Sequence, residues 1–345
     1  MEVGLVTVAL DAMGGDYGVD ATAEGAAQVS REAGDIRVLL VGDVSTVSAA
    51  LERYDYDPTR ICLVDSLGVV RMEQNPAQAL DDMANCSVLT AARLVSGGSA
   101  DALVSAGHTG ATVLAAARTM DCVPGICRAA LASVYPTGER HGPRSDPFAL
   151  MLDVGATLSA TADDLVGFAV MGSAYSSIIS EIKAPRVALL SNGSEPNKGN
   201  AAIVEAHQRL LASQLNFVGN VEGLDIPRGT VDVVVCDGFL GNVVLKMLEG
   251  VSDVVRELAR EAKSRRLQWR IGLSMLGQGL KELRRLTDWK MYGGAPLLGF
   301  DNVVIKAHGR SEARAIRNAV KVAAKAAEGG LVGRIRDGMS QLGEG

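Results

Sequence analysis

The stretch DALVSAGHTGA (Asp101–Ala111) joins a short apolar run to a turn with two glycines and the start of a helix. An apolar run bounded by turn residues indicates a buried strand, and the glycines mark the turn that follows it. The same succession occurs five more times, in DAMGGD (Asp11–Asp16), DVGAT (Asp153–Thr157), SNGSEPNKGN (Ser191–Asn200), CDGFLGN (Cys236–Asn242) and YGGAPLLG (Tyr292–Gly299). Repeated strand, turn and helix predict an α/β fold with a mainly parallel sheet.

In such a fold the ligand site lies at the carboxyl ends of the strands, where helix N-termini offer unpaired N–H groups to anions. The six turns therefore predict a phosphate-type ligand held at a single edge of the sheet. We expect strands at Gly4–Leu10, Arg37–Val41, Ile61–Val64, Ala102–Ser105, Phe148–Asp153, Val187–Ser191, Val231–Cys236 and Asn302–Lys306. Helices are expected at Thr109–Thr119, after Asn242 and at Ser311–Ala327, where Ile316, Val320 and Ala323 share one side.

A chain of 345 residues can bury a large core. Apolar residues make up 48% and aromatic residues only 4%, which is typical of a Val-, Leu-, Ile- and Ala-rich sheet covered by helices. We expect one α/β catalytic domain over residues 1–330 and a flexible, Gly-rich tail over 331–345. Residues 134–147 concentrate Pro, Gly and charge and are the nearest thing to a seam.

Several classes of function are disfavoured. The net charge of −6 argues against general nucleic-acid binding. Five cysteines without a CxxC pair indicate reduced thiols, and no metal-ligand spacing occurs, so we expect neither a metal nor a cofactor. The chain lacks GxGxxG after its first strand, GxxxxGK[ST] and GxSxG, which disfavours a dinucleotide site, a P-loop and a nucleophilic serine elbow. No apolar stretch is long enough to span a membrane, and no signal peptide is expected.

One segment differs in charge from the rest of the chain. Residues 263–290 hold eight Lys and Arg against two acidic residues, a net charge of +6. Apolar residues at helical spacing run through it, so it predicts a basic amphipathic helical excursion that contacts an anionic membrane surface or a partner subunit; plain packing in the core is the alternative. The expected membrane contacts are Trp269, Leu273, Leu276, Arg265, Arg266 and Arg270.

The turns also supply candidate catalytic residues. In SAGHTGA, Ser105, Thr109 and free N–H groups form an anion cradle, and His108 within it is either a proton carrier or, more commonly, a structural residue. In DAMGGD the glycines allow close approach of a ligand, or they simply make a tight turn capped by Asp. Lys198 is a point charge suited to phosphate or to an oxyanion, with an exposed loop lysine as the alternative.

Further candidates follow the later strands. Asp237 and Asn242 bracket a helix start, with Lys246 one turn further, although a helix N-cap is the commoner role for such an aspartate. His308 is the second candidate proton carrier.

Seven motifs together, in this order, resemble the bacterial phosphate acyltransferases (the acyl-ACP:phosphate acyltransferase, or PlsX, family). They are DAMGGD, SAG-x-TGA, LDVGA, KGN, VVVCDGF-x-GNV-x-LK, YGGAPLLG and IKAHG, and they cover about Val8 to Ala327. The resemblance implies transfer of a fatty acyl group from acyl carrier protein to inorganic phosphate, giving acyl phosphate for phospholipid synthesis through a membrane-bound glycerol-3-phosphate acyltransferase. It also implies a three-layer α/β/α fold akin to phosphotransacetylases and isopropylmalate dehydrogenase, and a homodimer in the cytoplasm, peripherally attached to the cell membrane.

With this reaction in view, we assign phosphate binding to the Ser105–Gly110 turn with Lys198. Oxyanion stabilisation falls to Asn242 or His308, with His108 as a further catalytic candidate. Asp11, Asp16 and Asp237 organise the loops. The remaining expected substrate-binding residues are Gly14, Gly15, Gly107, Thr109, Gly110, Asp153, Asn200, Gly238, Lys246, Gly293 and Gly294.

The chain departs from the family pattern at four places. His108 and Thr157 stand where the family usually has Asn, SEPN replaces a more acidic stretch without Pro, and Arg310 replaces a small Ser. The alternatives are an acyl-CoA-using phosphotransacetylase, a dehydrogenase of related fold, and a non-catalytic homologue that binds carrier protein or scaffolds a membrane.

Overall fold

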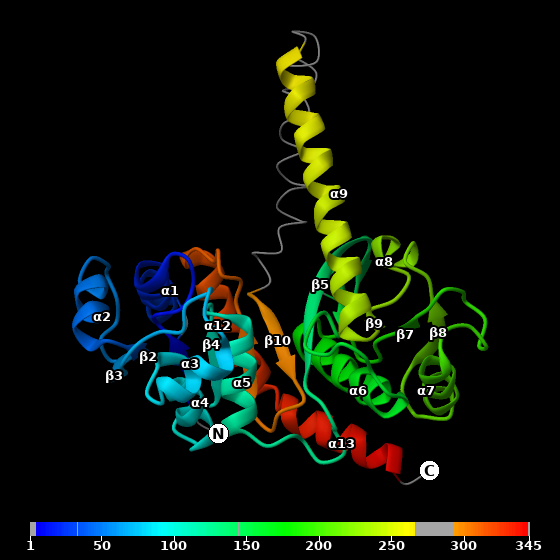
Figure 1. Cartoon of the computed structure of the whole chain (residues 1–345), viewed down its shortest axis with the longest axis horizontal. Helices are drawn as coiled ribbons and strands as arrows, with labels where there is room; N and C mark the ends of the chain where they lie inside the picture. Colours follow the sequence, from blue (N-terminus) through cyan, green and yellow to red (C-terminus); the bar gives the residue numbers. More distant parts are fainter. Residues whose placement is uncertain (1–4, 33, 144, 266–292, 344–345) are drawn as a thin grey trace.

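The computed structural model describes residues 5–32, 34–143, 145–265 and 293–343, which are built around one sheet of 11 strands (Figure 1). The strands are β1 (Val6–Asp11), β2 (Ile36–Gly42), β3 (Ile61–Asp65), β4 (Ala102–Ser105), β5 (Ala130–His141), β6 (Asp146–Leu152), β7 (Val187–Leu190), β8 (Phe217–Val221), β9 (Val233–Val235), β10 (Ala295–Leu298) and β11 (Val303–Lys306). Their order across the sheet is β3-β2-β1-β4-β11-β10-β5-β6-β9-β7-β8.

The sheet has two parallel halves that run in opposite directions. β3, β2, β1, β4 and β11 are parallel to one another, and so are β6, β9, β7 and β8. Between the halves, β10 pairs antiparallel with β11 and with β5, and β5 pairs antiparallel with β6. These three reversals leave the two halves antiparallel, so their carboxyl ends lie at opposite edges of the sheet. We call the edge at which β1, β4 and β11 end the first edge, and the other the second edge.

Helices cover both faces of the sheet. They are α1 (Gly18–Glu32), α2 (Val44–Leu51), α3 (Pro76–Asp82), α4 (Ser87–Ser96), α5 (Thr109–Thr119), α6 (Ala162–Ile179), α7 (Ala201–Leu211), α8 (Asp225–Arg228), α9 (Gly238–Arg265), α12 (Ala313–Glu328) and α13 (Leu331–Gly343). Because neighbouring residues of a strand point to opposite faces, Val8 and Leu10 of β1 enter one core cluster and Ala9 enters another. This arrangement confirms the predicted three-layer α/β/α fold.

The two faces are built differently. On the first face, residues of α1, α2, α6, α7, α12 and α13 share a single apolar cluster with both halves of the sheet. On the second face the core is divided, with α3, α4 and α5 over one half and α8 and α9 over the other. Leu131 of β5 packs against both second-face clusters and so lies at the join between them.

Two sequence-based expectations about the elements are wrong. The stretch after Tyr292 opens the strand β10 and not a helix. Residues 134–147, the nearest thing to a seam in the sequence, form most of the β5–β6 hairpin. The expected flexible tail is the helix α13, whose Leu331 and Ile335 are buried in the first-face cluster. Glycine and charge indicated loops at these places, but long-range pairing and apolar burial decide the structure there.

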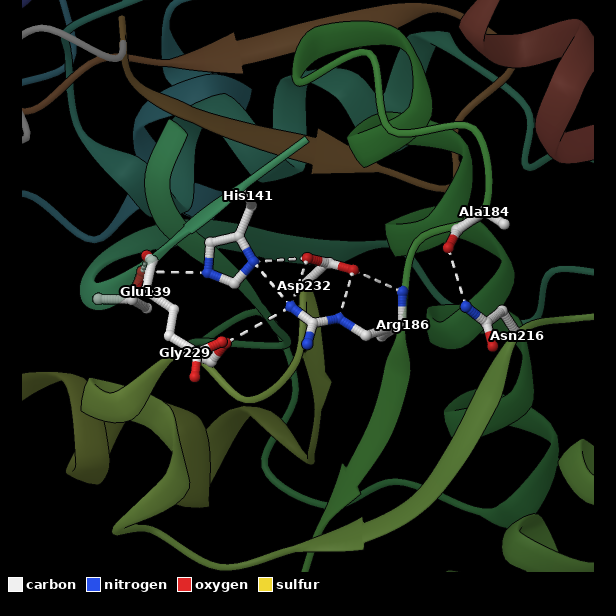
Figure 2. A network of polar contacts seen from close by, with 8 residues as sticks. Glu139, His141, Ala184, Arg186, Asn216, Gly229 and Asp232 are labelled. Carbon is white, nitrogen blue, oxygen red and sulfur yellow. Dashed lines mark hydrogen bonds and ion pairs between the residues drawn. The ribbon is translucent and has the colours of Figure 1, made fainter. Parts of the chain in front are cut away.

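A buried ion network fixes the β5–β6 hairpin to the second half of the sheet (Figure 2). Asp232, just before β9, contacts Nδ1 of His141 at 2.5 Å and accepts from the backbone N–H of Arg186 at 2.7 Å and from its Nε at 3.2 Å. Burial opposes ionisation, but the hydrogen bonds from His141 and Arg186 prevail and hold the pKa of Asp232 far below its ordinary value. The network therefore joins the ends of three strands.

The helix α9 leaves the body of the molecule and projects well beyond the sheet (Figure 1). Its exposed large apolar residues recur at helical spacing: Phe239, Val243, Met247, Val251, Val254, Val255 and Leu258. The expected basic excursion over residues 263–290 begins in the last turn of this helix, and its residues 266–290 lie outside the described residues.

Candidate active site

Three turns meet at the first edge of the sheet. In register across the ends of β1, β4 and β11, Asp11 pairs with Ser105 and Ser105 pairs with Lys306. Strand residues alternate between faces, and Leu10, Val104 and Ile305 all point into the first-face cluster. The side chains of Asp11, Ser105 and Lys306 therefore share the second face, beside α4 and α5.

The backbones of two of these turns lie so close together that one position has no room for a side chain. A Cβ at Gly14 would lie 2.6 Å from the backbone nitrogen of Gly107 and 2.7 Å from Oδ2 of Asp11. Gly15 has a φ of +97°, which favours glycine. The backbone N–H of Asp16 donates to the carbonyl of Gly309 at 2.8 Å. The turns 11–16, 105–110 and 306–310 thus form one joined structure, which we call the cradle.

The helix α5 points its N-terminus into the cradle. His108 is its N-cap, with Nδ1 accepting from the backbone N–H of Ala111 at 3.3 Å. The N–H groups of Thr109 and Gly110 belong to the first turn, which has no intrahelical acceptors for them. The cradle therefore offers backbone donors to an anion, and His108 has the structural role of a cap through one of its ring nitrogens.

The carboxylate of Asp11 holds the cradle together from inside. Ser105 donates its hydroxyl to Oδ2 of Asp11 at 2.7 Å, and the backbone N–H of Met13 donates to Oδ1 at 3.3 Å. Burial raises the pKa of Asp11 above its ordinary value, against the effect of these hydrogen bonds. The predicted loop-organising role of Asp11 agrees with this geometry.

Lys306 is a cradle residue that the sequence-based assignments omit. Its side chain is buried, and among the described residues its Nζ has one hydrogen-bond acceptor, the carbonyl of the neighbouring Ala307. Burial lowers its pKa to about 8, although Asp11 and Asp16 act in the other direction. The available signal was a lysine that ends the apolar run VVIK, at a position where a buried strand meets a turn.

The other first-edge candidates surround these groups. His308 is exposed, and its Nδ1 accepts from the backbone N–H of Arg310 at 3.1 Å. Burial of part of its ring and the charges of Lys306 and Lys246 lower the pKa of His308. Lys246 belongs to α9, so this helix of the second half brings charge toward the cradle; its Nζ pairs with Glu249 at 2.8 Å. Asn242 is an exposed residue one turn earlier on α9.

Gly293 and Gly294 also lie at the first edge, ahead of β10. A Cβ at Gly293 would lie 2.4 Å from the carbonyl oxygen of Asn318 in α12, and one at Gly294 would lie 2.8 Å from the carbonyl oxygen of Lys306. Both glycines have positive φ angles. Close packing of this segment against α12 and β11 therefore explains why both positions are glycine.

The turn DVGAT lies at the second edge, after β6. The carboxylate of Asp153 accepts from the backbone N–H groups of Leu131, Gly155, Ala156 and Thr157 at 2.7 to 3.1 Å. Both oxygens of the carboxylate therefore accept hydrogen bonds from backbone N–H groups. The geometry therefore explains Asp153 as an organiser of its turn, and substrate binding by Asp153 stays a prediction.

The neighbouring second-edge candidates are helix caps or close contacts. Asp237 accepts from the backbone N–H of Leu240 at 2.8 Å at the start of α9, and Asn200 accepts from Ile203 at 3.0 Å at the start of α7. A Cβ at Gly238 would lie 2.4 Å from Oδ2 of Asp153. These residues fix the helix starts against the strand ends.

The prediction that all six turns lie at one sheet edge is wrong. Lys198 follows β7, at the second edge, and six strand positions separate β7 from β4. At about 4.8 Å per strand, this is a lateral distance of about 29 Å. Within one chain, Lys198 and the Ser105–Gly110 turn therefore do not form a joint phosphate site. The reason is the reversal at β10 and β5, which no local pattern reveals.

The described ranges contain neither a cluster of metal-ligating side chains nor a membrane-spanning helix. Over residues 5–32, 34–143, 145–265 and 293–343, no group of three or more His, Cys, Asp or Glu side chains is placed to hold a metal ion. In the same part of the chain, no helix has the length and apolarity needed to cross a bilayer. Of the expected membrane contacts, Arg265 is the last residue of α9 and the others lie outside the described residues.

Solved structures show the same fold at low sequence identity. A phosphotransacetylase from Streptococcus pyogenes superposes with a TM-score of 0.60 at 18% identity, covering 93% of this chain and 94% of that one. A branched-chain phosphotransacylase from Enterococcus faecalis has a TM-score of 0.56 at 14% identity, with 93% and 99% covered.

Sequence relatives are much closer. The chain is 37% identical over 337 residues to a phosphate acyltransferase of Thermoanaerobacter pseudethanolicus, covering 98% of both. It is 42% identical over 319 residues to a phosphate acyltransferase of Nitratidesulfovibrio vulgaris, covering 92% of this chain and 90% of the relative. The model of the fatty acid synthesis protein family matches residues 6–334. Because this similarity extends over nearly its whole length, the chain belongs to this family of phosphate acyltransferases.

Proposed function

We propose that this protein transfers a fatty acyl group from acyl carrier protein to inorganic phosphate and releases acyl phosphate for phospholipid synthesis. The observation that carries the proposal is the cradle, in which free N–H groups at the start of α5 lie beside a buried lysine at the end of β11. A helix N-terminus and a buried cation are together well suited to a multiply charged anion.

The reaction needs little more than placement of the phosphate beside the thioester. Phosphate is already a charged nucleophile, and the thiolate that leaves has an ordinary pKa of about 8.5. Holding two reactants in the reactive geometry can lower a barrier by roughly 7–11 kcal/mol. Backbone donors at Thr109 and Gly110 serve the phosphate, and each further donor to the tetrahedral oxyanion contributes about 3–4 kcal/mol. We assign the role of such a donor to His308, which lies at the edge of the cradle and whose Nδ1 accepts from the backbone N–H of Arg310.

A second copy of the chain is the partner proposed for α9. Seven large apolar residues, at helical spacing, are exposed along this projecting helix. An apolar stripe of this size on an isolated helix is stable in water only when another surface covers it. The same stripe on an identical chain is self-complementary, which supports a homodimer.

The membrane surface is a further proposed partner. The basic segment over residues 263–290 follows α9 and carries a net charge of +6 with Trp269 among its apolar residues. Attraction between such a segment and anionic lipid supports peripheral attachment on the cytoplasmic side. There the product would pass to a membrane-bound glycerol-3-phosphate acyltransferase.

The test is phosphate-dependent consumption of palmitoyl-acyl carrier protein by the purified chain, with acyl phosphate trapped as the hydroxamate. Product that requires both phosphate and carrier protein supports the proposal. Turnover of short-chain acyl-CoA without carrier protein would instead make the chain a phosphotransacetylase, the function named for its structural neighbours. Binding of carrier protein with no turnover of either donor would indicate a homologue that has lost the reaction.

A further inference from the structure

We propose that Lys306 is a catalytic residue of this reaction, holding the attacking phosphate and giving the proton that the departing sulfur takes. The inference rests on the proposed acyl transfer. It concerns a residue whose side chain is buried at the end of β11, in register with Ser105 of the adjacent β4 and two strand positions from Asp11 of β1.

The first argument is the hydrogen-bonding capacity of the ammonium group. A lysine ammonium has three N–H donors. Among the described residues only the carbonyl of Ala307 accepts from Nζ of Lys306. A buried charge whose N–H donors are unpaired costs free energy, unless an anion or further acceptors bind to those donors. The remaining donors are therefore available to a ligand in the cradle.

The second argument is that the nearby carboxylates do not accept hydrogen bonds from Lys306. The carboxylate of Asp11 is bonded to Ser105 and to the backbone of Met13, while the carboxylate of Asp16 lies 4.0 Å from Nε of Arg310. Both carboxylates act on Lys306 through charge alone. The described cradle thus contains backbone donors and a lysine with unused donors, and a phosphate group supplies the acceptors that they lack.

The proton balance of the reaction gives Lys306 its second task. An oxygen of HPO₄²⁻ attacks the thioester carbonyl carbon, the new C–O bond forms, and the C–S bond breaks with its electron pair on sulfur. The Lys306 ammonium gives its proton to that sulfur, producing the thiol. The neutral amine then takes the remaining proton of the acyl phosphate. The products are the acyl phosphate dianion and the thiol, so no proton is gained or lost overall.

The acidity of Lys306 suits this exchange. Burial lowers its pKa to about 8, close to the value of about 8.5 for an ordinary thiol. A donor whose pKa lies near that of the acceptor transfers its proton with little cost in either direction. An exposed lysine, at about 10.4, would give up its proton far less readily.

Two substitutions separate holding the phosphate from giving the proton. Lys306→Arg keeps a positive charge, but a guanidinium does not lose its proton at neutral pH. Lys306→Met removes both properties in a side chain of similar length. Lys321→Met is the matched control, because Lys321 lies on α12 on the first face and pairs there with Glu32. Circular dichroism and thermal unfolding verify the fold of each full-length variant.

The measurements are calorimetric titration with inorganic phosphate and turnover with two donors. One donor is acyl carrier protein; the other is an acyl thioester of a strongly acidic aromatic thiol, whose sulfur leaves without a proton. We expect Lys306→Met to lose phosphate affinity. We expect Lys306→Arg to keep it, to lose about 100-fold or more in kcat with acyl carrier protein, and to recover most of that loss with the activated thioester.

The pH profile gives an independent readout. The charged groups that act on Lys306 are Asp11 of β1 and Asp16 of the next turn, and Lys306 in turn acts on His308 in its own turn. For the wild type, kcat/KM for phosphate should fall above about pH 8, where the free enzyme loses the Lys306 proton. The corresponding limb of kcat should lie at higher pH, since bound phosphate favours the ammonium.

Several results would overturn the inference. Unchanged phosphate affinity in Lys306→Met excludes a role in binding, and equal losses of kcat with both donors in Lys306→Arg exclude proton donation. If Lys306→Arg does not fold, Lys306→Met at high phosphate concentration provides the test. Equal turnover of this variant with acyl carrier protein and with the activated thioester would exclude proton donation by Lys306. A wild type that binds phosphate through Lys306 but never turns over acyl carrier protein would refute the proposed function and leave phosphate binding by Lys306 intact.

Discussion

Adding one methyl group at Gly14 should disable the cradle without unfolding the protein. Gly14 does not have a positive φ, so its requirement for glycine comes from space alone. The new Cβ would lie 2.6 Å from the nitrogen and 2.7 Å from the Cα of Gly107, and 2.7 Å from Oδ2 of Asp11. The contacting atoms of Gly107 belong to the backbone and cannot rotate away. Ordinary contact distances therefore require the turns 11–16 and 105–110 to separate by about 0.8 Å.

The size of the effect follows from this displacement. Overpacking of a tight site costs typically about 1–3 kcal/mol of stability, which a domain of this size tolerates. A displacement of about 1 Å at a reacting geometry lowers turnover by about 100-fold. Such a loss corresponds to about 2.7 kcal/mol in the barrier.

The assay compares Gly14→Ala with Gly223→Ala, since a Cβ at Gly223 would meet nothing within 4 Å. Phosphate-dependent hydroxamate formation gives kcat/KM, and urea unfolding gives the change in stability. We expect a loss of about 100-fold in Gly14→Ala and wild-type activity in Gly223→Ala. If Gly14→Ala retained activity within twofold of its control, contact between the two turns would not matter to catalysis and the cradle would be refuted as the active site.

Three further predictions concern assembly and stability. Val251→Asp with Val255→Asp places charge on the exposed stripe of α9 and should shift the protein from dimer to monomer in sedimentation velocity; an unchanged sedimentation coefficient would contradict the proposed interface. The depressed pKa of Asp232 contributes stability that is complete above about pH 4 and is lost as the pH falls toward the folded-state pKa, so Asp232→Asn should flatten the acid limb of unfolding free energy against pH measured by urea titration. Ile335→Ala in α13 should cost about 2–5 kcal/mol by the same method, whereas a flexible tail would show no change.

Local features of the sequence predicted much of the fold. The helix expected at Thr109–Thr119 has those bounds in the structure, because a Gly-rich turn and an Ala-rich face leave few other conformations for this segment. The apolar stripe of α12, with Ile316, Val320 and Ala323, is buried as expected. Short strands such as β10 were missed, since four residues carry too little periodicity to be recognised.

The candidate site was predicted only in part. The turns around Asp11 and Ser105 were recognised from their glycines and polar residues, and the structure joins them. Lys306 was omitted because a lysine that ends a strand is usually exposed, and its burial depends in part on β4 and β1, whose residues are far from it in sequence. Lys198 was assigned to the same phosphate as the Ser105–Gly110 turn, although it lies at the other edge.

The sequence by itself therefore determined the alternation of strand, turn and helix, the three-layer class and the family, because each of these depends on local pattern or on motifs. Only the tertiary structure decided which turns share an edge and which side chains are buried there. The physical reason is that strand direction is set by pairing between distant segments. The antiparallel pairings of β10 and β5 reverse the strand direction in the second half of the sheet. The sequence near Asp153 or Lys198 does not indicate this reversal.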